Sequence, residues 1–107
     1  MIYLDHGATT AVLPEVVEAM TPYFMEYYGN PSGNYEYGET SKKAIEQVRR
    51  TIADSLGAQP EEIYFTAGGT ESDNWALHGM ADLHPGGHII TTQIEHHAIL
   101  HTCEYLE

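Results

Sequence analysis

Apolar residues recur at helical spacing in four parts of the chain. Steps of three and four residues predict an amphipathic helix over about 13–27, with Pro14 in its first turn and Pro22 ending or kinking it. A second apolar face predicts a helix from about residue 40 to Gly57, where a left-handed C-cap would fall. Similar apolar patterns predict two more helices, one from the glycine turn at residues 68 and 69 to about residue 83 and one over 98–106.

Two short segments have the β-branched and aromatic composition of strands, 63–66 and 88–92. Strands that alternate with helices predict an α/β fold, in which helices flank a parallel sheet. Two strands are very few for a sheet, because a two-stranded unit is marginal in water without packing partners. We therefore expect an incomplete α/β unit that is part of something larger. The segment 29–34, dense in Gly, Asn, Pro and Ser, predicts a loop.

Charge and cysteine content narrow the class of protein. The 107 residues hold 16 Asp and Glu against 4 Lys and Arg, a formal net charge of −12, which argues against nucleic acid and anionic membranes as partners. One cysteine excludes a disulfide framework. No apolar stretch approaches the roughly 18 residues of a membrane span, and no secretion signal opens the chain. These features predict a single cytoplasmic unit.

The glycine turn within 65–74 is the most informative segment. Its two glycines let the backbone pass close to a bound group, and the helix that follows offers free N–H groups and a positive dipole end. A phosphate would fit there, held by Gly69 and Thr70. The alternative is a plain tight turn in which Thr70 and Asp73 form a capping box. Glu71 and Asp73 disfavour a bound phosphate unless their carboxylates point away.

Histidines gather in the last quarter of the sequence. His97 and His101 are four residues apart on a predicted helix and could meet one metal ion, although solvated histidines give the same pattern. His96 lies at a junction between a predicted strand and a predicted helix, where ligands of open α/β sheets bind. An imidazole at that position could stack on an aromatic cofactor or move a proton.

Four motifs together carry a family resemblance. In order and spacing they resemble the N-terminal part of the pyridoxal-phosphate-dependent cysteine desulfurases, a group of class V aminotransferases. The motifs are Tyr3-Leu-Asp-His-Gly-Ala-Thr-Thr10, Gly29-Asn-Pro-Ser32, Phe65-Thr-Ala-Gly-Gly-Thr-Glu-Ser-Asp-Asn74 and Ile90-Thr-Thr-Gln-Ile-Glu-His-His-Ala98. The resemblance covers 1–107 and implies a fragment of a longer enzyme, or a truncated gene product. It implies a single unit made of the N-terminal segment and the first part of a fold-type-I large domain.

The resemblance also assigns roles to individual residues. Gly69 and Thr70 match the pair that binds the phosphate of pyridoxal 5'-phosphate. His96 matches the histidine that stacks on the pyridine ring and assists proton transfer, so it is our catalytic candidate. Segments that border the active-site entrance of the family are matched by Ala8, Thr9 and Asn30.

Members of this family remove sulfur from L-cysteine, release L-alanine and leave a persulfide for iron–sulfur or thio-cofactor assembly. Their Schiff-base lysine, pyridine-nitrogen aspartate, loop cysteine and substrate-binding arginine match nothing in 1–107. Lys42 and Lys43 lie on an early helix, and Cys103 is expected to be a buried structural thiol. We therefore expect the chain alone to be inactive. The resemblance implies a homodimer and a sulfur-acceptor scaffold protein as a partner.

Two departures from the family pattern leave the subgroup open, Tyr35 in place of a common histidine and Ala67 in place of a common serine. The family's strand order also implies that 63–66 and 88–92 do not pair directly. Three alternatives stand beside the desulfurase. They are another class V enzyme such as a selenocysteine lyase or an aminotransferase, a non-catalytic dimerisation or interaction module, and a histidine-based metal binder.

Overall fold

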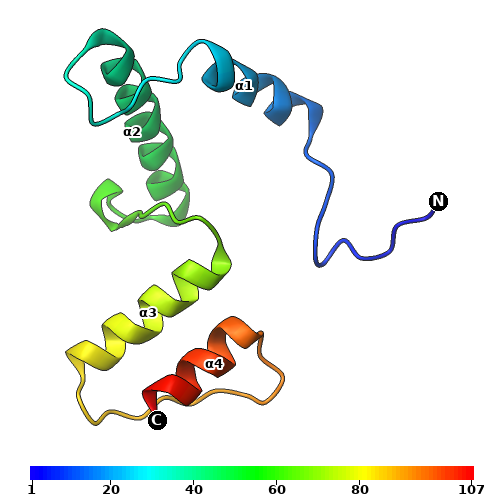
Figure 1. Cartoon of the computed structure of the whole chain (residues 1–107), viewed down its shortest axis with the longest axis vertical. Helices are drawn as coiled ribbons and strands as arrows, with labels where there is room; N and C mark the ends of the chain where they lie inside the picture. Colours follow the sequence, from blue (N-terminus) through cyan, green and yellow to red (C-terminus); the bar gives the residue numbers. More distant parts are fainter. The chain divides into compact units, whose positions relative to one another are not determined.

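The computed structural model describes all residues, 1–107, and its regular structure is entirely helical (Figure 1). Four α-helices form where the apolar periodicity predicts them, with a short 3₁₀ helix between the second and third. The bounds are α1 Pro14–Met25, α2 Glu36–Leu56, η1 Pro60–Glu62, α3 Gly69–Leu83 and α4 His97–Leu106. The chain divides into two compact units, Met1–Ile63 and Tyr64–Glu107.

Helix α1 begins at Pro14, whose fixed φ suits the first helical position. It continues through Pro22 to Met25, so of the two effects predicted for Pro22, ending the helix is wrong. Proline removes one N–H from the helix, but the Pro22 carbonyl still accepts from the amide of Glu26 at 2.7 Å. No residue of α1 is buried, and Phe24 on its apolar face is 71% exposed.

Helix α2 begins at Glu36, four residues earlier than predicted, and ends at the predicted glycine. Gly57 is left-handed, with φ of 67°, and its N–H bonds the carbonyl of Asp54 at 3.4 Å. The C-cap prediction is therefore confirmed. Helix η1 packs against α2, and the Arg49 guanidinium donates through Nε to the carbonyl of Ile63 at 3.2 Å.

The loop before α2 is tightly built. The Asn30 side chain accepts from the amide of Ser32 at 2.9 Å through Oδ1, which closes an Asx turn. A Cβ at Gly29 would lie 2.4 Å from the carbonyl carbon of Tyr37, a separation that real side chains do not adopt. Glycine is therefore required at this position by close contact between the loop and the first turn of α2.

Neither predicted strand forms, so the predicted parallel sheet is absent from the chain as it stands. Residue Ile63 does have extended backbone, with φ of −98° and ψ of 120°. An extended segment becomes a strand only when a second segment pairs with its N–H and C=O groups. The segments 63–66 and 88–92 find no such partner within 1–107, which is why their strand-like composition does not produce a sheet.

Helices α3 and α4 pack against each other in the second unit (Figure 1). Ala98 and Thr102 of α4 are buried at 6% and 5% exposure, and no large side chain is fully buried anywhere in the chain. Small and polar residues therefore make the centre of this unit. No helix combines the length and apolar character that crossing a bilayer requires.

Candidate functional site

The first turn of α3 carries three unbonded backbone N–H groups. Gly68 is the N-cap, and the first intrahelical bond runs from the amide of Ser72 to the Gly68 carbonyl at 3.2 Å. The amides of Gly69, Thr70 and Glu71 therefore face outward without helical partners, at the positive end of the helix dipole. This is an arrangement that favours an anion.

The two glycines leave open space in front of these amides. A Cβ added to Gly68 or Gly69 would meet no atom within 4 Å, so packing within the chain does not demand glycine there. The Thr70 hydroxyl has no hydrogen-bond partner of its own. An approaching phosphate thus finds backbone without side chains at Gly68 and Gly69 and a free hydroxyl donor at Thr70.

The capping box that we considered for Thr70 and Asp73 does not form, because α3 begins at Gly69 and Gly68 occupies the N-cap. Glu71 turns back instead, and its Oε2 accepts from the amide of Ala67 at 2.6 Å. Glu71 still lines a pocket of about 560 Å³ at this turn, whereas Asp73 does not. One of the two carboxylates therefore remains beside the anion position.

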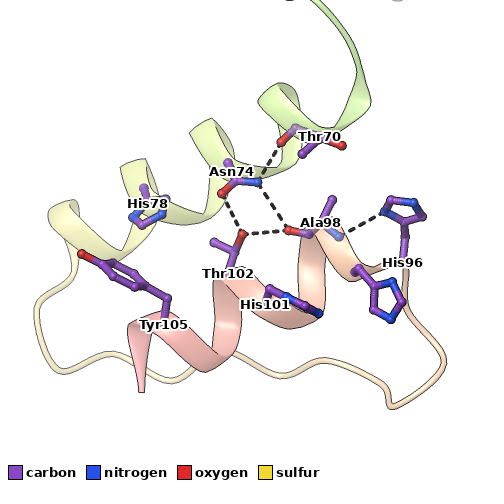
Figure 2. Close-up of a pocket in the computed structure, with 9 residues that line it drawn as sticks. Thr70, Asn74, His78, His96, Ala98, His101, Thr102 and Tyr105 are labelled. Carbon is purple, nitrogen blue, oxygen red and sulfur yellow. Dashed lines mark hydrogen bonds between the residues drawn. The ribbon is translucent and has the colours of Figure 1, made fainter.

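His96 is the N-cap of α4, and its ring is fixed by a backbone bond. Its Nδ1 accepts from the amide of Ala98 at 3.1 Å (Figure 2). A ring nitrogen that accepts an N–H carries no proton, which assigns the proton of the neutral imidazole to Nε2. The side chain is exposed, so Nε2 and the ring are open to a ligand.

The first turns of α3 and α4 lie at the same end of the helix pair (Figure 2). Thr70 and His96 line one pocket of about 610 Å³, together with Asn74, His78 and Tyr105. A second pocket, at the glycine turn, is also lined by Thr70 and Asn74. The structure thus brings the predicted phosphate and histidine positions to one place.

Two polar residues that the sequence analysis missed lie between these positions. Thr102 donates to Asn74 Oδ1 at 2.8 Å, and Asn74 Nδ2 donates to the carbonyl of Thr70 at 2.8 Å. Helical spacing could have predicted the contacts within each helix, since Asn74 lies one turn after Thr70 and Thr102 lies one turn after Ala98. The pairing across the two helices has no signature in the sequence.

The remaining candidates form no metal or disulfide site, although His97 and His101 line the same pocket as His96. The rings of His97 and His101 are 5.0 Å apart between centroids, but no group of three His, Cys, Asp or Glu side chains is placed to hold a metal ion. Cys103 is half-buried on α4 and unpaired in any disulfide. The predicted entrance residues belong to the other unit and are Ala8, Thr9 and Asn30.

The pocket residues fit the two ends of pyridoxal 5'-phosphate. Free amides at Gly69 and Thr70, the free Thr70 hydroxyl and the lack of a side chain at Gly69 suit a phosphate dianion, and the nearby Glu71 opposes it. An exposed imidazole held at one nitrogen suits a flat heteroaromatic ring. These residues do not include a lysine that could bind the cofactor's aldehyde covalently.

Comparison with known proteins shows the family of the chain. Residues 2–107 match the family model described as aminotransferase class-V. The chain is 60% identical over 108 residues to "Cysteine desulfurase IscS" of Methanosarcina thermophila and 51% identical to the protein of that name from Clostridium botulinum (strain Kyoto / Type A2). Each alignment covers 99% of this chain and 27% of the relative, so the chain spans about a quarter of their length.

A solved structure extends the comparison to three dimensions. It is described as a NifS-like protein, with a TM-score of 0.90 and 41% sequence identity, and the match covers 98% of this chain and 29% of that one. The family model matches almost the whole chain. The chain belongs to the aminotransferase class-V family.

Proposed function

We propose that this chain is the N-terminal part of a pyridoxal-phosphate-dependent cysteine desulfurase and supplies one part of its cofactor site. The proposal rests on one observation: Thr70 and His96, at the starts of α3 and α4, line the same pocket. The 60% identity to a protein named cysteine desulfurase supports the reaction. The whole enzyme would take L-cysteine as substrate and yield L-alanine and a persulfide for iron–sulfur or thio-cofactor assembly.

Gly69 and Thr70 would bind the cofactor phosphate. Their amides donate along the helix axis and the Thr70 hydroxyl adds a third donor, so a dianion there would be held by charge-assisted hydrogen bonds. His96 would lie against the pyridine ring and hold or transfer a proton at Nε2, because Nδ1 is occupied by the Ala98 amide. Pyridoxal phosphate, when bound, supplies an electron sink for carbanions.

The proposal extends to the domain and its partners. Residues 1–107 would form the N-terminal segment and the first part of a fold-type-I large domain, whose parallel sheet would include 63–66 and 88–92. Exposed Ile90, at 93%, supports a covering neighbour for the second segment. We propose a cytoplasmic homodimer that delivers sulfur to a scaffold protein, in keeping with the lack of disulfides and the apolar face exposed on α1.

Binding of a cofactor analogue tests the phosphate assignment directly. Pyridoxine 5'-phosphate is the probe, because it lacks the aldehyde that would react with Lys42 or Lys43. Quenching of Trp75, the single tryptophan, reports binding close to the turn. We expect saturable binding that weakens about tenfold in Thr70→Val, the loss expected for one hydrogen bond to a charged group.

Two controls make the result specific. Pyridoxine without its phosphate should bind more weakly than the phosphate ester. Thr51→Val removes a hydroxyl that bonds only Gln47 within α2, and we expect it to bind the probe like the parent chain. Equal affinity for both probes, or equal loss in both variants, would contradict the phosphate turn.

A further inference from the structure

Helices α3 and α4 are joined by a polar pair, the half-buried Asn74 and the buried Thr102. The Thr102 hydroxyl donates to Asn74 Oδ1 at 2.8 Å, and Asn74 Nδ2 makes a longer bond, 3.5 Å, to the carbonyl of Ala98 (Figure 2). Both hydrogen bonds between the two helices therefore involve Asn74. We call Asn74 and Thr102 the interhelical pair.

This pair lies where the unit is most buried. Thr102 and Ala98 are 5% and 6% exposed, and no large apolar side chain is fully buried around them. Interdigitating side chains usually set the separation of packed helices. Here small side chains and polar bonds take that place, so the register between α3 and α4 depends strongly on the interhelical pair.

Each member of the pair also holds one half of the proposed site. Asn74 Nδ2 donates to the carbonyl of Thr70 at 2.8 Å, and the single Thr102 hydroxyl proton is shared between Asn74 Oδ1 and the carbonyl of Ala98, whose oxygen lies 2.7 Å from the hydroxyl. The Ala98 amide in turn donates to His96 Nδ1 at 3.1 Å. One run of hydrogen-bonded residues thus leads from the glycine turn through both helices to the imidazole (Figure 2).

We infer that Asn74 and Thr102 are positioning residues, which hold the phosphate turn and the His96 ring at a fixed separation. The inference rests on the proposed function for the ligand that spans them. A rigid ligand with a phosphate at one end and a ring at the other is bound tightly only when its two contacts are preset. Neither Asn74 nor Thr102 needs to touch the ligand for this effect.

The first experiment uses the chain without any ligand, so that it does not depend on cofactor binding. Thr102→Val keeps the shape of the side chain and removes its hydroxyl. We expect it to shift the amide NMR signals of Gly69–Ser72, on the other helix, and the ¹⁵N signal of His96 Nδ1. Thr102→Ser restores the hydroxyl and should return both sets of signals toward those of the parent chain.

Thr51→Val is the matched control, because the Thr51 hydroxyl bonds a carbonyl within its own helix and lies in the other unit. We expect it to leave the signals of α3 and α4 unchanged. Shifts confined to α4 in Thr102→Val would overturn the inference. So would the absence of exchange-protected amides in α3 and α4 of the parent chain, since no fixed helix pair would then exist.

The second experiment separates this inference from the proposed function. Thr102→Val should bind pyridoxine 5'-phosphate about three- to tenfold more weakly, the range expected for one neutral hydrogen bond, whereas its affinity for inorganic phosphate should be unchanged. Equal loss for both probes would overturn the positioning role. If the parent chain binds neither probe while Thr102→Val shifts the α3 signals, the proposed function fails and the coupling stands.

Discussion

The Glu71 carboxylate accepts the amide proton of Ala67, four residues before it, at 2.6 Å. This bond closes the glycine turn and orders the backbone in front of α3. It also leaves a negative charge in the lining of the same pocket that offers three free amides. The Glu71 side chain therefore stabilises the turn through its hydrogen bond and weakens anion binding through its charge.

Glu71→Gln separates the two effects. Glutamine keeps an oxygen acceptor for the Ala67 amide but removes the charge, so we expect affinity for pyridoxine 5'-phosphate to rise about two- to fivefold at low salt. The gain should shrink as ionic strength rises. Titrations at two salt concentrations check this, with Glu36→Gln in the first turn of α2 as the control for net charge. A gain that persists at high salt would contradict the electrostatic explanation.

Gly57 and Gly79 form a contrasting pair for stability. Gly57 ends α2 in the left-handed region, with φ of 67°, so Gly57→Ala should destabilise the helix by about 1 kcal/mol. Gly79 lies inside α3, where an added Cβ would meet no atom within 4 Å, and Gly79→Ala should stabilise that helix by about 0.5–1 kcal/mol. Circular dichroism during thermal unfolding measures both. The same sign of change in both variants would contradict the backbone assignment.

The loop before α2 should be intolerant of any side chain at Gly29. A Cβ there would lie 2.4 Å from the backbone carbonyl of Tyr37, and backbone cannot move aside as a flexible side chain can. We expect Gly29→Ala to cost about 1–3 kcal/mol of the free energy of unfolding. Gly7→Ala is the matched control, because a Cβ at Gly7 meets no atom within 4 Å. Chemical denaturation of both variants gives the comparison.

Desulfuration by the isolated 107-residue chain provides a further test. Neither lysine lies near the cofactor pocket residues in sequence or on their helices, and Cys103 is half-buried on α4. Without a covalent anchor for the cofactor and an exposed thiol to accept sulfur, the reaction has no route. We therefore expect no alanine from L-cysteine and pyridoxal phosphate beyond that formed without protein. Protein-dependent alanine that survives Cys103→Ala would require another acceptor.

Local patterns predicted most of the helices and one cap. The apolar spacing of α2 and the position of Gly57 depend on contacts within a few residues, so the sequence contained them. The segments 63–66 and 88–92 differ, because a strand requires a partner that its own composition does not supply. The N-cap of α3 is Gly68, two residues before Thr70, so the capping box considered for Thr70 does not form.

The site was accessible to sequence reasoning only in part. The glycine turn and the resemblance pointed to Gly69, Thr70 and His96, and the fold brings the last two into one pocket. Asn74 and Thr102 were not found, because a hydrogen bond between residues 28 positions apart depends on how two helices pack. The register between two packed helices is set in three dimensions and produces no periodic pattern in the sequence.

The uncovered apolar face of α1 has a consequence for the behaviour of the chain at high concentration. Exposed apolar side chains attract one another, whereas a net charge of −12 keeps chains apart over about a Debye length. Added salt shortens that length and leaves the apolar attraction in place. Charge repulsion therefore keeps the chains separate in solution, and their tendency to self-associate increases with ionic strength.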